Sequence, residues 1–310
     1  MQVLLAQPRG FCAGVTRAID IVERALVRHG APVYVFHEIV HNQWVVNDLR
    51  ARGAVFVDSL KQVPRHSHVV FSAHGVSNEV VAQARQLHLH AVDATCPLVS
   101  KVHQQAQRFE RQGHTLLMIG HAGHEEVVGT MGRVNGPVHL VSQVADVAAL
   151  QVPPGAPMAY VTQTTLSLDD TREIIAALQA RFPQIVGPDV NDICYATQNR
   201  QVAVRALAAQ VNTVLVVGAR NSSNSNRLRE VAQRGGVAAH LVQDASEISP
   251  HWLHPHARVG VTSGASTPEV LVQQVVNALQ ALHHGPVVQL PGVREDVMFR
   301  LPAEVANEMA

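Results

Sequence analysis

The sequence predicts an α/β fold of three similar units, each with a small parallel sheet. Helix-like stretches alternate with short apolar runs, polar loops follow these runs, and similar residues recur at similar spacing in three parts of the chain. Such alternation favours parallel strands with right-handed crossovers and helices on both faces. The 310 residues are enough for two or three domains. The predicted units are residues 1–95, 96–190 and 191–310.

Each of the three cysteines stands just before, or at the start of, a predicted helix. After Cys12, apolar residues recur at helical spacing until Gly30, a suitable stop. Cys96 precedes Pro97, which is favoured as a first helical residue. Cys194 precedes a similar apolar stripe. We therefore expect three helices that begin beside a thiol.

Short apolar runs bounded by glycine, proline or polar residues predict the buried strands. One set follows the three helices, at residues 33–36, 115–119 and 213–217. A second set lies at residues 69–71, 158–161 and 259–261. Both sets lead into polar loops. Ligands of open α/β sheets gather beyond the carboxyl ends of the strands, so these loops are the candidate site.

The spacing of polar residues after each cysteine indicates an internal repeat. Cys12, Cys96 and Cys194 precede His41, His124 and Asn224 by 29, 28 and 30 residues, and His74, Thr164 and Ser266 by 62, 68 and 72. Such self-similarity predicts one unit of roughly 90 residues repeated three times. A pseudo-threefold arrangement would direct three sheet edges, and three cysteines, to one centre. The segment from about residue 285 has no copy, and we interpret it as a closing segment.

Composition argues against several classes of function. Twenty-four basic and twenty-four acidic residues give no net charge, and aromatic residues make up 4%. Both values disfavour nucleic-acid binding, which needs basic surfaces or stacking platforms. No run approaches the ~18 apolar residues of a membrane span, and the N-terminus turns polar too early for a signal peptide. We expect a cytoplasmic protein, and a reducing compartment disfavours disulfides.

Three cysteines at equivalent positions of a repeat point to a soft-metal site. Zinc usually takes four ligands, often in closely spaced pairs, and such pairs are missing from this sequence. An iron–sulfur cluster accepts ligands that are dispersed in sequence. With three thiolates, one iron of a [4Fe–4S] cluster would remain open to bind substrate as a Lewis acid. The alternative for each cysteine taken alone is a buried core residue.

The loop at residues 218–226, GARNSSNSN, offers hydroxyls, amides and backbone N–H groups that suit phosphate. It matches neither a Walker loop nor GxGxxG, and the alternative is an ordinary polar turn. His41, His74 and His124 each follow a strand and could donate hydrogen bonds to the same small anion. The other histidines, His66, His68, His88 and His90 among them, are expected to face solvent without a function.

Two acids and two threonines complete the candidate set. Glu126 could supply protons at a strand end, whereas we expect Glu125 to interact with the dipole at the start of a helix. Thr164 and Thr165 could orient a hydroxyl or relay a proton. The alternative for these threonines is helix capping.

An ordered set of motifs resembles the family of 4-hydroxy-3-methylbut-2-enyl diphosphate reductases, the LytB family. The motifs are PRGFCAGVTRAI, FSAHGVS, DATCPLVSKVH, GHAGHEE, TQTTLS, ICYATQNRQ, NSSNSNRL and GASTPE. They cover essentially the whole chain and are highly specific as a set. The resemblance implies three α/β units around a central [4Fe–4S] cluster with one open iron. It also implies the last step of the non-mevalonate pathway of isoprene biosynthesis.

In that step, two electrons and two protons convert (E)-4-hydroxy-3-methylbut-2-enyl diphosphate to isopentenyl and dimethylallyl diphosphates, with loss of water. The resemblance implies that Cys12, Cys96 and Cys194 bind the cluster. Glu126 would be the main proton source, assisted by the Thr164 hydroxyl and by His124. The implied substrate-binding residues are His41, His74, His124, Thr164, Thr165, Ser222, Ser223, Asn224 and Ser266. A small ferredoxin or flavodoxin is the implied electron donor.

One motif departs from the family, which usually reads His-Pro-Glu-Val-Glu-Gly where this chain has His124 to Gly129. Glu125 replaces the proline and Val128 replaces a second acid, while the position of Glu126 is kept.

Two other classes of function are alternatives to the reductase. A non-catalytic iron–sulfur sensor or carrier needs no open iron, would normally supply a fourth thiolate, and has no use for the polar loops. A zinc-dependent phosphohydrolase predicts more aspartate and histidine ligands and no need for three thiolates. Metal analysis separates these classes.

Overall fold

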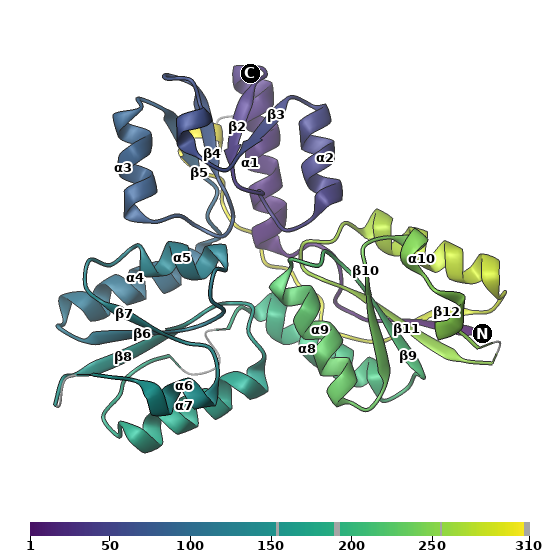
Figure 1. The fold of residues 1–310 in the computed structure, drawn as a ribbon. Helices are drawn as coiled ribbons and strands as arrows, with labels where there is room; N and C mark the ends of the chain where they lie inside the picture. The colour runs from purple at the N-terminus through teal and green to yellow at the C-terminus, as the bar shows by residue number, and fades with distance from the viewer. Residues whose placement is uncertain (153–154, 189–192, 255, 307–310) are drawn as a thin grey trace. The chain divides into compact units, whose positions relative to one another are not determined.

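The computed structural model describes residues 1–152, 155–188, 193–254 and 256–306. Within these ranges the strands form three parallel sheets of five, four and three strands, with helices packed around them (Figure 1). The predicted α/β class with three small parallel sheets is confirmed. By the contacts between its residues the chain divides into two compact units, which are described separately. The first unit comprises residues 1–13, 41–45 and 194–298, and the second comprises residues 14–40, 46–193 and 299–310.

The four-stranded sheet of the second unit has the order β3-β2-β4-β5. Its two helical crossovers, through α2 and α3, run in opposite directions along the sheet, which places these helices on opposite faces. The elements of this part are α1 (Ala13–His29), β2 (Val33–Phe36), α2 (Gln43–Ala51), β3 (Ala54–Val57), η1 (Leu60–Gln62), β4 (His68–Phe71), α3 (Asn78–Gln86) and β5 (His90–Asp93).

The three-stranded sheet, also in the second unit, has the order β7-β6-β8. Helices α4 and α5 lie on one face, and α6 and α7 lie on the other (Figure 1). The elements are α4 (Pro97–Arg111), β6 (Thr115–Ile119), α5 (Glu125–Met131), β7 (Val138–Val141), α6 (Val144–Ala149), β8 (Met158–Thr162) and α7 (Leu168–Arg181).

The five-stranded sheet belongs to the first unit and has the order β10-β9-β11-β1-β12. Its helices α8 and α9 pack together on one face, and α10 covers the other face. The elements are β1 (Gln2–Leu5), α8 (Tyr195–Ala208), β9 (Thr213–Val217), α9 (Ser223–Arg234), β10 (Ala238–Val242), η3 (Ala245–Glu247), η4 (Pro250–Trp252), β11 (Arg258–Ser263), α10 (Glu269–Leu282) and β12 (Val287–Gln289).

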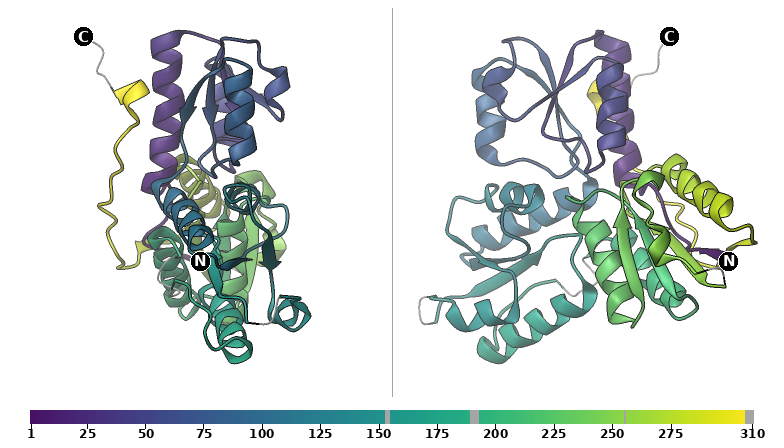
Figure 2. Two further views of the ribbon diagram at one scale, coloured as in Figure 1. Left: turned by 90° about the vertical axis from the view of Figure 1, so that its left-hand side faces the viewer. Right: turned by 45° about the vertical axis from the view of Figure 1, so that its right-hand side comes forward.

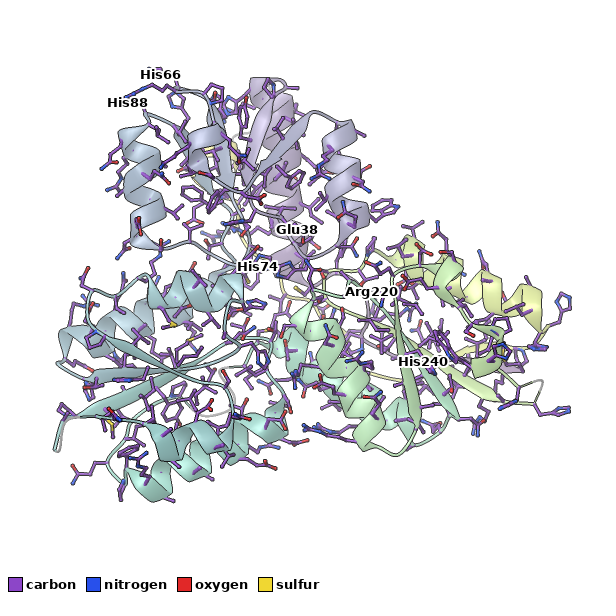
Figure 3. The ribbon with its side chains drawn as sticks, in the orientation of Figure 1. Glu38, His66, His74, His88, Arg220 and His240 are labelled. Atoms are coloured by element: carbon purple, nitrogen blue, oxygen red, sulfur yellow. The ribbon has the colours of Figure 1, made fainter. Side chains whose placement is uncertain are left out.

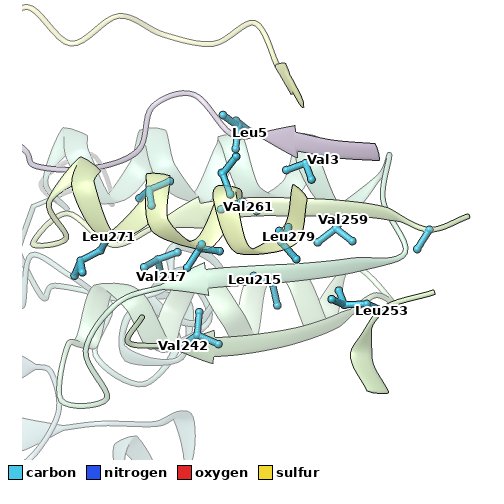
Figure 4. Close-up of a cluster of buried hydrophobic side chains, with 14 residues drawn as sticks. Val3, Leu5, Leu215, Val217, Val242, Leu253, Val259, Val261, Leu271 and Leu279 are labelled. Carbon is cyan, nitrogen blue, oxygen red and sulfur yellow. The ribbon is translucent and has the colours of Figure 1, made fainter. Parts of the chain in front are cut away.

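Alternating side chains of the five-stranded sheet fill two separate apolar layers. Val3 and Leu5 of β1 pack with residues of α10, including Leu279 (Figure 4). Leu4, between them, packs with α8 residues such as Leu207 on the opposite face. Because successive strand side chains point to opposite faces, one short apolar run serves both layers. This double burial explains why the predicted strands are continuously hydrophobic.

The six predicted strands and the three helices beside the cysteines are confirmed. Residues 33–36, 115–119 and 213–217 are the strands β2, β6 and β9, and the second predicted set falls within β4, β8 and β11. Helix α1 starts one residue after Cys12, and Cys96 and Cys194 are the N-cap residues of α4 and α8.

The two ends of the chain meet in one sheet, a feature that the repeat pattern did not predict. β1 pairs with β11 on one side and with β12, after residue 285, on the other. Beyond β12 the chain runs without regular structure until α11 (Ala303–Ala306) (Figure 2). In this segment Glu295 accepts hydrogen bonds from the fully buried guanidinium of Arg200, which also donates to the Gly10 carbonyl at 2.8 Å. The closing segment therefore supports the loop that leads to Cys12.

Within the described ranges, every helix is too short or too polar to cross a lipid bilayer.

Candidate functional site

In the first unit, hydrogen bonds join the backbone around Cys12 to the loop after β11 and to Tyr195, which follows Cys194. The Cys12 amide donates to the carbonyl of Ala265 at 3.1 Å. The next amide, of Ala13, donates to the phenol oxygen of Tyr195 at 3.3 Å. Burial raises the pKa of Tyr195 to about 12, and negative charge on Cys12 adds to the increase. Tyr195 therefore stays protonated beside Cys12 at neutral pH.

Thr197 connects Cys194 to the Ser/Asn-rich loop. Its amide and hydroxyl lie 3.4 and 3.1 Å from the Cys194 Sγ. Asn224 donates from Nδ2 to the same hydroxyl at 3.4 Å and accepts from the Ala265 amide at 3.0 Å. Thr197 and Asn224 are both buried. A polar network thus runs from the backbone at Cys12, through Ala265 and Asn224, to the thiol of Cys194.

The Ser/Asn-rich loop forms the N-terminus of α9. Ser222 caps this helix, because its hydroxyl accepts from the Ser225 amide at 3.2 Å. A methyl group added at Gly218 or Gly264 would overlap the Ser225 hydroxyl, so glycine is required for the close approach of these two loops. Ser223 is the first residue of α9. The open amides of a helix N-terminus suit an anion, which fits the predicted phosphate site.

His41 and Ser266 lie beside this loop in the same unit. The Ser266 hydroxyl donates to the His41 carbonyl at 3.0 Å. The His41 Nδ1 lies 3.3 Å from the side-chain nitrogen of Asn221. The first unit therefore brings together the predicted residues Cys12, His41, Cys194, Ser222, Ser223, Asn224 and Ser266.

In the second unit, Glu126 is held by Thr164 through two hydrogen bonds. The carboxyl oxygens of Glu126 lie 2.7 Å from the Thr164 amide and 2.8 Å from its hydroxyl, and both groups donate. Glu126 is 2% exposed and Thr164 is 4% exposed. The Glu126 amide also donates to the His124 Nδ1 at 3.1 Å. The predicted acid and its predicted hydroxyl partner are therefore in direct contact.

Glu125 makes a contact that its position in the first turn of α5 did not predict. Its Oε2 lies 2.7 Å from the His74 Nδ1. The rings of His74 and His124 lie edge to face, with 6.0 Å between their centroids. A carboxylate at Nδ1 makes that nitrogen the protonated one and fixes the orientation of the ring. Glu125 therefore positions His74 in addition to facing the dipole of its helix.

Cys96 lies beside a guanidinium. Its amide donates to the Ala73 carbonyl at 3.0 Å. Arg17 donates to the carbonyls of Ala94 and Thr95, just before the cysteine, at 3.3 and 3.1 Å. Burial lowers the pKa of Arg17, and negative charge on Cys96 opposes this effect. The cation and the first turn of α4 both favour the thiolate form of Cys96.

Gln163 orders the remaining predicted residue, Thr165. Its side chain donates to the Thr165 hydroxyl at 3.0 Å and accepts from the His121 amide at 3.0 Å. Gln163 has no exposed surface, so the loops after β6 and β8 are joined by a buried amide.

The loop that carries His74 rests on a buried histidine, His103. Gly75 has φ +82°, and a methyl group there would stand 2.5 Å from the His103 Cε1. Burial lowers the pKa of His103 to about 4; Arg133 lowers it further, and Asp93 opposes. His103 is therefore neutral at physiological pH.

Known proteins resemble this chain over its full length. The LytB protein family model matches residues 3–280. The chain belongs to the LytB family. A 4-hydroxy-3-methylbut-2-enyl diphosphate reductase 2 of Bradyrhizobium diazoefficiens is 59% identical, with 99% of both chains covered. The reductase of Bordetella pertussis is 58% identical, with 100% of this chain and 95% of that protein covered.

Two solved structures of LytB-type reductases resemble the fold. The E-1-hydroxy-2-methyl-but-2-enyl-4-diphosphate reductase of Plasmodium falciparum superposes with a TM-score of 0.94 at 37% identity, covering 98% of this chain and 96% of that one. A second structure, described as the terminal enzyme of the non-mevalonate pathway, gives a TM-score of 0.65 at 29% identity, covering 90% and 99%.

The three cysteines fit the iron–sulfur group on which the LytB family depends. They are half-buried thiols outside disulfides. Each lies at a helix N-terminus, where the partial positive charge favours thiolate.

The sequence did not predict the residues that hydrogen-bond to the candidate site residues or to their neighbours in the chain, notably Thr197, Tyr195 and Gln163. Thr197 had a visible signal, because it stands three residues after an N-cap cysteine, where helix-capping contacts form. Tyr195 and Gln163 had none, since their partners are distant in sequence.

Neutral His103 makes the stability of this loop depend on pH. Because its folded pKa is lower than the unfolded value of 6.5, the unfolded chain takes up the proton first as pH falls. Stability from this group is complete above pH 6.5 and is lost toward pH 4. The difference between the two pKa values corresponds to about 3 kcal/mol of unfolding free energy. We expect thermal unfolding to show a steeper loss of stability on acidification in the wild type than in His103→Gln; parallel curves would contradict this account.

Proposed function

We propose that this protein removes the hydroxyl group of (E)-4-hydroxy-3-methylbut-2-enyl diphosphate by reduction. The products are isopentenyl and dimethylallyl diphosphates and water. Full-length relatives at 59% and 58% identity carry the name of that reductase. The structural observation that carries the proposal is the buried Glu126 carboxyl, bound at 2.7 and 2.8 Å by Thr164. A buried acid coupled to a hydroxyl is what protonation of a leaving group requires.

The proposed cofactor is a [4Fe–4S] cluster held by Cys12, Cys96 and Cys194. When bound, it would supply the two electrons one at a time, and its iron without a thiolate would act as a Lewis acid toward the substrate hydroxyl. The chain contributes the thiolates and the charges that stabilise them. Arg17 beside Cys96 is such a charge, and the phenol of Tyr195, which stays neutral, accepts from the amide next to Cys12.

The diphosphate serves as a handle that fixes the reacting carbon, and it is not cleaved. In the first unit, the N-terminal turn of α9 offers backbone amides and hydroxyls for this anion. His74 would bind it with a ring oriented by Glu125. The proposed binding set is His41, His74, His124, Thr164, Thr165, Ser222, Ser223, Asn224 and Ser266.

The proton path is the part of the reaction that this chain performs with its own groups. Hydroxide is a poor leaving group, so the C–O bond breaks readily only when a proton arrives and water departs. Glu126 would give this proton through the Thr164 hydroxyl, whose oxygen lies 2.8 Å from the carboxyl. His124, which accepts from the Glu126 amide, holds the acid in position. The two electrons would come from a small ferredoxin or flavodoxin.

The first experiment measures iron and acid-labile sulfide in protein purified without oxygen, then records the spectrum of the cluster with and without the allylic diphosphate. We expect about four of each per chain and a spectrum that shifts with substrate. Cys194→Ser should lose most of both elements. Zinc in place of iron would refute the proposed iron–sulfur cofactor. A cluster whose spectrum does not change with the diphosphate would favour a sensor or carrier.

Glu126→Gln tests the proton path with little change in shape. The amide cannot supply the proton, so we expect turnover to fall by about two orders of magnitude or more. Iron content and the substrate-induced spectral shift should stay near wild-type levels. Near-normal turnover would remove Glu126 from the path.

Glu125→Gln and Glu125→Pro test the positioning of His74. Both remove the carboxylate, and proline is also favoured at the first position of α5, so the helix start is kept. We expect KM for the diphosphate to rise roughly tenfold in both variants, with a much smaller change in kcat. If KM is unchanged in both, the contact between Glu125 and His74 has no role in binding.

A further inference from the structure

Histidines gather at the amino-terminal end of the four-stranded sheet, away from the loops described above. His68 begins β4 and His90 begins β5, and the two are direct partners in the strand register. His29 is the last residue of α1. His66 and His88 stand two residues before His68 and His90, so the pattern His-x-His occurs twice. All five histidines belong to the second unit.

The rings form two stacks. His29 and His68 lie 3.6 Å apart between ring centroids, with 13° between their planes. His68 and His90 lie 5.0 Å apart at 29°. His66 and His88 form a separate pair, 5.5 Å apart, at the end of the sheet remote from His74 (Figure 3). Three imidazoles from three different elements therefore form one continuous group.

We propose that His29, His68 and His90 bind one divalent transition-metal ion of the zinc type. Imidazole nitrogen is a preferred ligand of zinc, nickel and copper. Zinc bound by three histidines completes its tetrahedron with water. The site is separate from the three cysteines and does not depend on the proposed reaction.

Electrostatics at this end of the sheet favours a metal ion over protons. Burial lowers the pKa of His29 and of His68, and the neighbouring charges of Arg28 and His90 lower the pKa of His29 further. The rings of His29 and His68 are therefore held in the neutral form at physiological pH, which is the ligating form. His29 also ends α1, where the helix dipole favours a cation. Arg28 is the cation that opposes this effect, and its side chain is exposed.

The ring nitrogens of these histidines do not converge on one point as the rings stand, so metal binding requires the side chains to turn. Stacked rings direct their nitrogen lone pairs side by side, whereas ligands of one zinc ion point at a common centre, with nitrogens about 3.3 Å apart. His68 is the shared neighbour of the other two rings, with its centroid 3.6 Å from that of His29 and 5.0 Å from that of His90. His29 and His90 are exposed and can turn, while His68 is half-buried and fixed by its strand.

The test titrates untagged protein, purified without oxygen and carrying its full metal complement, with Zn²⁺ by calorimetry at neutral pH. We expect one zinc ion per chain with micromolar affinity. His68→Gln should weaken binding about tenfold or more, and so should His29→Gln, a change at an exposed helix end that leaves the sheet intact. The visible spectrum and iron content should stay constant, which shows that zinc has not entered at the cysteines.

The double variant His66→Gln/His88→Gln is the matched control. This control removes two nearby imidazoles, one more than either single variant, but leaves the three-ring group in place. Its affinity for zinc should therefore stay within about twofold of wild type. No saturable binding by the wild type would overturn the proposal. So would equal weakening in the control, or zinc uptake that releases iron.

Discussion

The structure depends on the coincidence of a thiol with the first turn of a helix, which occurs three times. At Cys12, Cys96 and Cys194 a polar loop ends and a helix starts, so the positive end of a helix dipole stands beside each cysteine. This placement favours the thiolate without an extra lysine or arginine at every cysteine. It also ties the position of sulfur to the backbone, which the apolar layers of each sheet hold in place.

Buried polar pairs provide the second level of order. Thr197 with Asn224 joins the first turns of α8 and α9, and Glu126 with Thr164 joins the first turn of α5 to the loop after β8. All four side chains have almost no exposed surface. A buried polar group without a partner is costly, so each pair resists any movement that would separate its loops. The chemistry of the loops and their rigidity thus come from the same residues. Gln163 adds a second buried link between the segments after β6 and β8.

The sequence was most informative where the interactions are local. Apolar runs such as residues 213–217 were recognisable because both faces of the sheet are buried. The weaker strands β1 and β12 were missed, since their pairing depends on residues more than 250 positions apart. The contact of Glu125 with His74 was likewise out of reach, because it requires α5 to pack on the loop after β4. His68 and His90 could be read as separate surface residues, but only the strand register makes them neighbours.

The position of β1 between β11 and β12 in the five-stranded sheet has a consequence for biosynthesis. β1 leaves the ribosome long before its partners β11 and β12, which lie more than 250 residues further along the chain. The other two sheets use only residues 33–162 and can assemble while translation continues. During that time the apolar side chains of Val3, Leu4 and Leu5 have no sheet to join. The loop of Cys12 therefore takes shape only after β11 and β12 have been made, and a centre that needs this cysteine matures after that point.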